Sequence, residues 1–436
     1  MTTLSGISLR FTGRIDAQSL EDRRALIDRA VSQDYSIRDT VSRIIESVRA
    51  RGDAALLDLA RELDRVELTS IEVPSARIDA SLTALSPALQ SAMSRAARNI
   101  ERVHTAQLPR EAVVDVEPGV VIVRRPDPLE RVGIYAPGGT ASYFSSVLMC
   151  AIPARIAGVR EIVMCTPPLS DGFPAPELLA AAAIAGVDRV FAIGGAGAIA
   201  AMALGTQTVP KVDRIVGPGN AYVAEAKMQL ASVVGIDSQA GPSELLVIAD
   251  ESASPEVIAR EVIAQAEHDV RATVIVVAIG SVTAANIESA LNDMVRSQSR
   301  SEIVLEALRQ RGGIIVADST SEAIGLANAF APEHLLIATR DADELAETSR
   351  NAGSVFVGET SSVAFGDYIT GGNHVLPTGG TARWYSGLST LDFVRWTTVQ
   401  RVSRAAAAAL STDTALLAET EGLPAHAGTA SQWAEQ

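Results

Sequence analysis

The chain has 436 residues, 47% of them hydrophobic and 20% charged, which allows more than one hydrophobic core and is ordinary for a globular protein. Its formal net charge of −15 argues against nucleic acid or an anionic membrane surface as a partner, because both are themselves negatively charged. The two cysteines, Cys150 and Cys165, can form neither a disulfide framework nor a CxxC metal motif.

The sequence also predicts a cellular compartment. The N-terminal segment MTTLSGISLRFTGR lacks the apolar core of a signal peptide, and the longest apolar run, at 178–187, is too short to span a bilayer. Scarce cysteine fits a reducing cytosol. We therefore expect a cytoplasmic protein that binds neither nucleic acid nor a membrane.

The N-terminal part of the chain is predicted to be helical. Apolar residues recur at intervals of three and four and so define one helix face, at Val41, Ile44, Ile45 and Val48. Gly52 is expected to end this helix, and another is expected over 54–63. Further along, His104 lies in the charged stretch RNIERVHTAQ, so we expect it to be a solvated surface residue.

From Arg131 onward, short apolar runs alternate with helical patterns. The expected strands are 132–136, 161–166, 189–193, 244–250, 273–279, 314–318, 334–338 and 354–358. Helices are expected between them, among others at 145–157, 221–232, 254–268, 320–330 and 342–351. This alternation predicts two α/β units with parallel sheets, divided near Gly241-Pro242, and a helical tail after Gly380 that docks onto another subunit.

Three glycine-containing turns come after strands of the first unit. The run GGAGAIAA contains G-x-G-x-x-A at Gly195, Gly197 and Ala200, which is the pattern of a helix N-terminus that binds a pyrophosphate. Asp213 lies about 20 residues further on, where a ribose-binding acid would be sought. A single match is weak, since tight strand–helix turns use glycine anyway, and Asp213 could equally belong to an ion-paired strand start.

The other two turns are YAPGG at 135–139 and GPGN at 217–220. Both come at the carboxyl ends of predicted parallel strands, where open α/β sheets bind ligands. The alternative is that both are simple turns.

Histidine is scarce, and its distribution points to one site. Four of the five histidines lie in the C-terminal part of the chain in polar surroundings, namely His268, His334, His374 and His426. Because histidine titrates near neutral pH and is the commonest metal ligand, this grouping suggests a site assembled from several segments.

Three local patterns carry the chemistry of that site. The Gly-rich stretch GDYITGGNHVLPT (366–378) places Asp367, Tyr368 and His374 on what is predicted to be one non-regular loop. Its alternative is a polar surface turn. The other two patterns are residue pairs.

Gln265 and His268 are three residues apart on a predicted helix, so both can face one metal, or they form a solvated helix end. Glu333 and His334 lie at the entry to the HLLIA strand. A histidine beside a carboxylate can act as base and water activator, although an ordinary polar strand entry is the commoner case.

Together these motifs resemble those of the histidinol dehydrogenases over nearly the whole chain. They are, in order, RVGIYAPGGTASYFSSVLM, IGGAGAIAAMALGT, KVDRIVGPGNAYVAEAK, AGPSELLVIAD, QAEHD, APEHLLI, AGSVFVG, GDYITGGNHVLPTGGTAR and EGLPAH. The resemblance implies an enzyme with one Zn²⁺ per subunit that oxidises L-histidinol to L-histidine with two NAD through a bound aldehyde.

The resemblance also implies roles for individual residues. His334 would be the general base and Glu333 the activator of water. The zinc ligands would be Gln265, His268 and Asp367, with His426 donated by the partner subunit of a homodimer. These six would also contact the substrate, together with Ser243, Tyr368, His374 and Glu421. Contacts to NAD would come from Tyr135, Gly197 and Asn220.

For the fold, we expect two Rossmann-like units, an N-terminal helical arm and a small C-terminal helical domain, in a homodimer with exchanged tails. The expected division is 1–32 for the arm, 33–130 with 243–375 for the larger unit, 131–242 for the second unit and 376–436 for the dimer-contacting domain. Two positions depart from the family pattern. Gly197 stands where many members have a Gln that contacts NAD, and Val363 stands where some have a Glu.

Three other functions are compatible with parts of the sequence. A related enzyme could oxidise another polar alcohol, but His374, Tyr368 and Glu421 all match the substrate-binding set. A zinc hydrolase that uses Glu333 on bound water would leave the nucleotide-type turns unexplained. A non-enzymatic binding protein would have no need of the acid–base pair. Failure to bind NAD would favour the last two.

Overall fold

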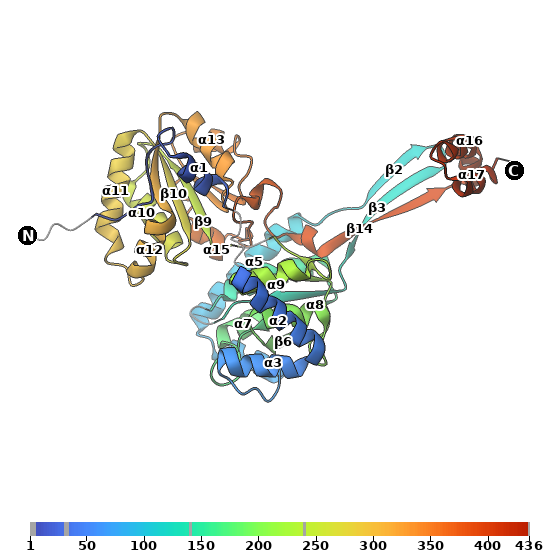
Figure 1. Cartoon of the computed structure of the whole chain (residues 1–436), viewed down its shortest axis with the longest axis horizontal. Helices are drawn as coiled ribbons and strands as arrows, with labels where there is room; N and C mark the ends of the chain where they lie inside the picture. Colours follow the sequence, from blue (N-terminus) through green and yellow to red (C-terminus); the bar gives the residue numbers. More distant parts are fainter. Residues whose placement is uncertain (1–5, 30–34, 139–141, 239–240, 435–436) are drawn as a thin grey trace, which may run out of the picture.

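The computed structural model describes residues 6–29, 35–138, 142–238 and 241–434. Two parallel sheets form two lobes, and a three-stranded antiparallel sheet projects from them and carries the C-terminal helices at its far end (Figure 1). The expected α/β class with parallel sheets is confirmed, whereas the antiparallel sheet was not expected. No helix of the described part of the chain is long and apolar enough to cross a membrane.

The first lobe, called here the six-stranded lobe, has the strand order β1-β11-β10-β9-β12-β13. Its strands are β1 (Phe11–Arg14), β9 (Glu244–Ala249), β10 (Thr273–Ile279), β11 (Gly312–Ala317), β12 (His334–Ala338) and β13 (Ser354–Val357). Its helices are α1 (Leu20–Ile27), α10 (Pro255–Ala266), α11 (Ser281–Val295), α12 (Ser301–Arg311), α13 (Thr320–Phe330), α14 (Ala342–Ala346) and α15 (Val363–Tyr368).

The second lobe, called here the five-stranded lobe, has the order β6-β5-β4-β7-β8. Its strands are β4 (Arg131–Tyr135), β5 (Glu161–Thr166), β6 (Arg189–Ala192), β7 (Arg214–Val216) and β8 (Gly235–Ile236). Four helices lie between or after them, α6 (Phe144–Ala157), α7 (Pro176–Ala185), α8 (Gly195–Leu204) and α9 (Ala221–Leu230).

Both parallel sheets are buried on both faces, as their nearly uninterrupted apolar strands require. Along β9, Leu245 and Val247 belong to the hydrophobic core on one face of the sheet, and Leu246 and Ile248 to the core on the other. The strands therefore supply alternate residues to two cores, and helices must cover each face.

The N-terminal helices pack on the five-stranded lobe. They are α2 (Tyr35–Arg51), α3 (Asp53–Leu59), a short π-helix (Ala60–Asp64), α4 (Ser75–Ala84) and α5 (Pro87–Ala106). Helix α2 contacts α8 and α9, while α4 and α5 contact α7 and α6. The apolar face predicted for α2 is buried there in the core that contains Tyr135 and Phe191. The expected grouping of 33–130 with 243–375 therefore differs from the observed packing, because periodicity identifies an apolar face but not the sheet that it covers.

The N-terminal arm is not purely helical, contrary to expectation. Strand β1 pairs in parallel with β11 at the edge of the six-stranded sheet, and α1 contacts α13. Edge pairing of this kind is directed by unpaired backbone groups of the neighbouring strand, which leave little mark on the sequence of a four-residue segment.

The projecting sheet has the order β14-β3-β2, with strands β2 (Ala112–Glu117), β3 (Val120–Pro128) and β14 (Val394–Val402). Two helices, α16 (Arg404–Thr420) and α17 (Pro424–Ser431), end the chain. This sheet with its two helices is called the extension below. The tail after Gly380 was expected to be helical, but two short 3₁₀ segments (Thr381–Arg383 and Thr390–Phe393) and β14 precede the helices. Antiparallel pairing with β3, far away in the sequence, decides the conformation of 394–402.

Candidate active site

The residues expected to act as acid and base lie at the beginning of β12. His334 is the first residue of the strand and Glu333 directly precedes it, and they are 4% and 6% exposed. His334 Nδ1 lies 2.9 Å from the Glu244 carbonyl oxygen, and Glu333 Oε2 accepts the Glu244 N–H at 2.7 Å. The first backbone groups of β9 are thus paired with two side chains in place of a strand partner.

This contact determines the tautomer of His334. A carbonyl oxygen can only accept, so Nδ1 carries the proton and, in the neutral ring, Nε2 keeps its lone pair. Among the described residues, Nε2 is buried without a hydrogen-bond partner, and it faces Asp367 Oδ1 at 3.6 Å. A buried polar atom with no partner calls for an explanation, and a substrate group to be deprotonated supplies one.

Two carboxylates beside the His334 ring stabilise its protonated form. Burial alone would lower the pKa of His334, but the carboxylates of Glu333 and Asp367 outweigh it and hold this pKa well above its ordinary value. Burial would in turn raise the pKa of Asp367, but contact with His334 and the nearby charges of His374 and His268 keep it below its ordinary value. The site thus favours a proton on the imidazole and a charge on the carboxylate.

His374 lies on the stretch singled out in the sequence. Its Nδ1 donates to the Asp367 carbonyl at 2.8 Å, and its Nε2 lies 3.1 Å from the Ser146 hydroxyl of α6. Burial lowers its pKa. The stretch was expected to be one non-regular loop, but Asp367 and Tyr368 end helix α15, and only the residues after Tyr368 are irregular.

The expected exposure of His104 was wrong, and its contacts with the loop before His374 were not predicted. It was expected to be solvated, yet it is 1% exposed, on the buried face of α5. Its Nδ1 donates to Ile100 O, and its Nε2 lies 3.4 Å from the Asn373 amide, which also donates to Met149 O at 2.7 Å. The sequence could have indicated this burial, because Ile100 and His104 are four residues apart and therefore lie on the same helix face.

Helices α5 and α6 thereby hold the loop that carries His374. Besides the Asn373 contacts, Asn99 of α5 donates to Ile369 O at 2.7 Å. Both helices belong to the five-stranded lobe, whereas α15 and β12 belong to the six-stranded lobe. The loop therefore lies between the two lobes, and each lobe contributes to its position.

A cavity of about 450 Å³ opens beside these residues. His334, Asp367 and His374 line it, along with Phe356 and several hydroxyl side chains. A volume of this order suits a small polar molecule.

The residues expected to bind zinc are brought together only in part. Gln265 is 3% exposed near the end of α10, and His268 comes two residues after that helix, close enough for its charge to act on Asp367. An imidazole, a carboxylate and an amide oxygen are suitable zinc donors. No group of three or more His, Cys, Asp or Glu side chains able to hold a metal occurs among the described residues. One chain thus offers a fitting but incomplete donor set.

Two expected site residues lie elsewhere in this chain. His426 on α17 and Glu421 at the end of α16 are exposed on the helices at the far end of the extension, which projects away from the two lobes (Figure 1). By contrast, Ser243 directly precedes β9 beside Glu244, and Tyr368 is 53% exposed next to Asp367.

The expected nucleotide contacts lie at the carboxyl ends of strands in the five-stranded lobe. Tyr135 ends β4, and its hydroxyl accepts the Gly195 N–H at the start of α8 at 3.1 Å. Burial raises the pKa of Tyr135 to about 12. Gly197 instead packs against α3, where an added Cβ would lie 2.9 Å from Leu59 Cδ1, so it faces a protein helix. Asp213 accepts the N–H groups of Glu130 and Arg131 and thus organises a strand start, which agrees with the alternative to a ribose-binding role.

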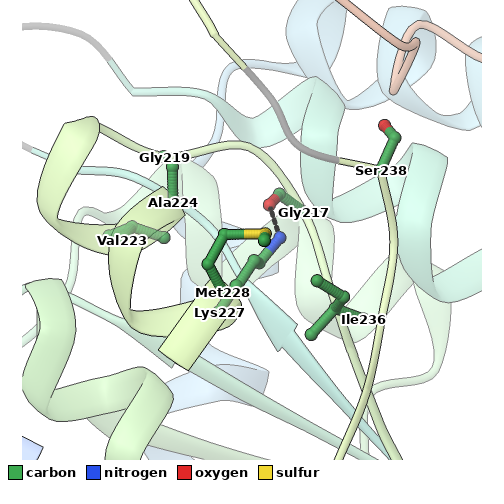
Figure 2. Close-up of a pocket in the computed structure, with 8 residues that line it drawn as sticks. All are labelled: Gly217, Gly219, Val223, Ala224, Lys227, Met228, Ile236 and Ser238. Atoms are coloured by element: carbon green, nitrogen blue, oxygen red, sulfur yellow. Dashed lines mark hydrogen bonds between the residues drawn. The ribbon is translucent and has the colours of Figure 1, made fainter. Parts of the chain in front are cut away.

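The GPGN turn is held by Lys227, which donates to the Gly217 carbonyl oxygen (Figure 2) and forms a buried ion pair with Asp237. Lys227 Nζ donates to Gly217 O at 2.5 Å and to Asp237 Oδ1 at 2.6 Å, and Asp237 Oδ2 accepts the Gly217 N–H at 2.7 Å. Gly217 has φ of +114°, and a Cβ there would lie 2.1 Å from Tyr135 O. The turn delivers Asn220, whose side chain caps α9 by accepting from Tyr222 N and Val223 N. A second fixed turn therefore lies next to Tyr135.

A model of the family described as histidinol dehydrogenase matches residues 27–432. The chain belongs to the histidinol dehydrogenase family. Its histidinol dehydrogenase relatives include the protein of Methanosarcina mazei, 46% identical over 392 residues, which are 90% of each chain. The protein of Clostridium acetobutylicum is 45% identical over 410 residues, 94% of each chain.

The solved structures agree with the sequence relatives. The crystal structure of histidinol dehydrogenase from Elizabethkingia anophelis matches with a TM-score of 0.93 and 36% identity over 99% of both chains. Histidinol dehydrogenases are NAD-dependent oxidoreductases of histidine biosynthesis, and membership of this family confirms the resemblance recognised in the motifs.

Proposed function

We propose that the chain oxidises L-histidinol to L-histidine in two NAD-dependent steps, through L-histidinaldehyde. The observation that carries this proposal is the position of His334 Nε2, which is buried without a hydrogen-bond partner in the part of the chain that the structure describes and faces Asp367, while Nδ1 lies near Glu333. An enzyme that removes hydride from an alcohol must first take the hydroxyl proton, and an imidazole whose protonated form is stabilised by two carboxylates is suited to receive it.

Each oxidation moves one proton and one hydride. In the first, His334 Nε2 accepts the hydroxyl proton and the carbinol hydride passes to NAD, which leaves the aldehyde and NADH. Water then adds to the aldehyde, and Glu333 is placed to take its proton. In the second, His334 accepts a proton from the hydrated aldehyde and a second hydride passes to a second NAD, which leaves the carboxylate.

Zinc is proposed to be held by Gln265, His268 and Asp367 of one chain and by His426 of a second copy. When bound, it would fix the amine and imidazole of histidinol and so orient the reacting carbon. Ser243, Tyr368 and His374 are proposed to contact the substrate from the same chain, and Glu421 from the second copy.

A homodimer with exchanged tails is proposed because the donor set of one chain is incomplete. The extension presents apolar side chains to solvent, with Val113, Val114 and Val116 of β2 at 58%, 53% and 59% exposure and Leu416 and Leu417 of α16 at 62% and 68%. Exposed apolar surface on a projecting element is typical of a protein interface. A second copy bound there could bring its own α17, with His426, to the cavity.

For the cofactor, we propose that NAD binds at the carboxyl ends of β4, β6 and β7, with contacts from Tyr135 and Asn220. Support comes from the two fixed turns at that edge of the sheet. A contact from Gly197 would require α3 to move, since Leu59 lies against it.

The reaction is tested by counting products. Purified, zinc-loaded protein should form two NADH and one histidine for each L-histidinol. One NADH with accumulated aldehyde would contradict the second oxidation, and no NADH despite measurable NAD binding would point to another polar alcohol.

The shared site is tested by complementation. His426→Ala and His334→Gln homodimers should each be nearly inactive, because every site lacks one group. Dimers that combine the two variants hold one site with both groups intact, so co-expression should restore activity. Absence of restored activity in verified heterodimers would contradict exchange of the tails, and unchanged zinc content in His426→Ala would contradict its role as ligand.

A further inference from the structure

A buried ion pair behind the catalytic residues connects them to the N-terminal arm. Arg29, just after α1, and Glu244, the first residue of β9, each have a side chain that is 4% exposed. The guanidinium binds both carboxylate oxygens, with Nε 2.8 Å from Oε1 and Nη2 3.0 Å from Oε2. Such a two-pronged pair fixes orientation as well as distance.

The remaining contacts of Arg29 fix the guanidinium. It donates to the carbonyl oxygens of Leu26 and Phe330, the latter at 2.8 Å, and lies 3.3 Å from the centre of the Phe330 ring. Lysine could supply the charge at this position but neither the planar stacking nor the paired donors.

Glu244 is in contact with both catalytic residues through its backbone. Its carbonyl accepts from His334 Nδ1, and its N–H donates to Glu333 Oε2. Its side chain also accepts the Gly379 N–H at 3.0 Å, on the segment that comes after His374. Glu244 thus contacts the N-terminal arm, the acid–base pair and the segment that follows His374.

Stability alone does not account for such a pair. Burying two charges costs about as much as their attraction returns, and apolar side chains of the same volume often serve a fold as well. Apolar side chains would not, however, hold the start of β9 in a set orientation toward His334 and Glu333. The arrangement is therefore better suited to positioning than to stabilisation.

We propose that Arg29 and Glu244 are positioning residues of this enzyme: they hold the Glu244 backbone so that His334 presents Nε2 and Glu333 lies beside it. This inference rests on the proposed function, because it assigns the chemical steps to those two residues. It gives Arg29 of the N-terminal arm a positioning role.

The experiment compares Arg29→Lys, Arg29→Met and Glu244→Gln with Arg14→Ala. Arg14 lies on the same arm and pairs with Asp318, but in an exposed position remote from His334, so its removal controls for loosening of the arm. Steady-state kinetics with histidinol and NAD, zinc content and thermal unfolding are measured for each zinc-loaded protein. The wild type must form NADH from histidinol; if it does not, the proposed function fails before this inference is tested.

Misplacement of catalytic groups by a fraction of an ångström to one ångström costs roughly 10- to 100-fold in rate. We expect kcat to fall about 10-fold in Arg29→Lys and roughly 100-fold in Arg29→Met, with KM for both substrates within about twofold of wild type. Glu244→Gln should fall between them, and Arg14→Ala should retain wild-type kcat.

A double-variant cycle separates positioning from a general structural effect. In a His334→Gln background, Arg29→Lys should cause a much smaller further loss of residual activity, since one of the two groups that it positions is gone. The same fold loss in both backgrounds would overturn the proposal. So would wild-type kcat in Arg29→Lys, or failure of that variant to fold, because the pair would then serve the fold alone.

Discussion

The two lobes have the same architecture but use opposite edges of their sheets. In the five-stranded lobe, the two fixed turns come after the carboxyl ends of β6 and β7, beside Tyr135 at the end of β4, and such ends are the usual ligand sites of open α/β sheets. In the six-stranded lobe, Glu244 and His334 begin β9 and β12, so the acid–base pair lies at the amino ends. Helix α10 ends at the same edge, before β10 begins, and brings His268 there.

The difference shows how a strand start can serve catalysis. At an amino end the first backbone groups are not yet paired in the ladder, so side chains can bond to them. Glu333 and His334 do so at Glu244, and the bond gives His334 its tautomer. At the carboxyl ends of the other lobe, side chains hold turns instead, because Tyr135 accepts the Gly195 N–H and Asp237 and Lys227 bond to the backbone of Gly217. The proposed function accordingly assigns the reactive side chains to one lobe and cofactor binding to the other.

The largest effect is expected from the six-stranded lobe. His334→Gln should lower kcat by roughly 10²- to 10⁴-fold, because it removes the proton acceptor. NAD affinity should be unchanged, since the cofactor is assigned to the other lobe, and NAD titration checks this. A loss of NAD affinity as large as the loss in kcat would contradict the proposal that the two lobes have separate roles.

The converse test addresses the five-stranded lobe. Lys227→Met leaves Asp237 charged and unpaired, with both side chains 5% exposed in the native protein, and should destabilise the fold by roughly 3–5 kcal/mol. It also frees the Gly217 turn, so KM for NAD should rise more than KM for histidinol. Urea unfolding and steady-state kinetics check both. The exposed Arg160–Glu130 pair provides the control, and Arg160→Ala should change little.

A smaller effect should distinguish the two members of the acid–base pair. Glu333→Gln retains an oxygen for the Glu244 N–H but cannot take a proton from water. Oxidation of supplied L-histidinaldehyde should slow about 10-fold or more, while oxidation of L-histidinol to the aldehyde slows less. Single-turnover formation of NADH from each substrate measures the two rates. Equal slowing would assign Glu333 to both steps.

The smallest effect is expected where the lobes meet. Burial holds the pKa of His104 below its ordinary value, although contacts with the backbone of Ile100 and Leu388 oppose this. The unfolded chain then binds a proton that the folded chain resists, so the contribution of His104 to stability is present above about pH 6.5 and is lost as pH falls below it.

His104→Gln should therefore show a flatter fall in the free energy of unfolding between about pH 6.5 and 5 than the wild type. Urea titrations at several pH values check this. Parallel slopes for the two proteins would mean that His104 titrates normally and does not hold Asn373 as a neutral ring.

Much of the fold was predictable, because it depends on local pattern. The strands 161–166, 273–279 and 334–338 and the helix 320–330 have the expected bounds. The predictions that failed depend on contacts between distant segments. Strand β14 forms because β3 lies beside it, and α2 to α5 join the five-stranded lobe because its core accepts their apolar faces.

Three residues of the expected site line the cavity, but the contacts that hold them in place were not predicted. Scarce histidines and their neighbours pointed to His334, His374 and Asp367, which the structure brings to one cavity. His104 was misjudged because charged neighbours on a helix say little about the single face that packs inward. Arg29 and Glu244 gave no signal, since they are 215 residues apart and each is ordinary in its own context.

The sequence by itself determined the kind of elements, their order and the residues suited to acid–base and metal chemistry, because periodicity and side-chain chemistry are local properties. Only the tertiary structure decided which sheet edge carries the acid–base pair, which nitrogen of His334 is free, and how far His426 lies from the cavity of its own chain. These depend on which backbone and side-chain groups meet across long separations, and that is settled by packing.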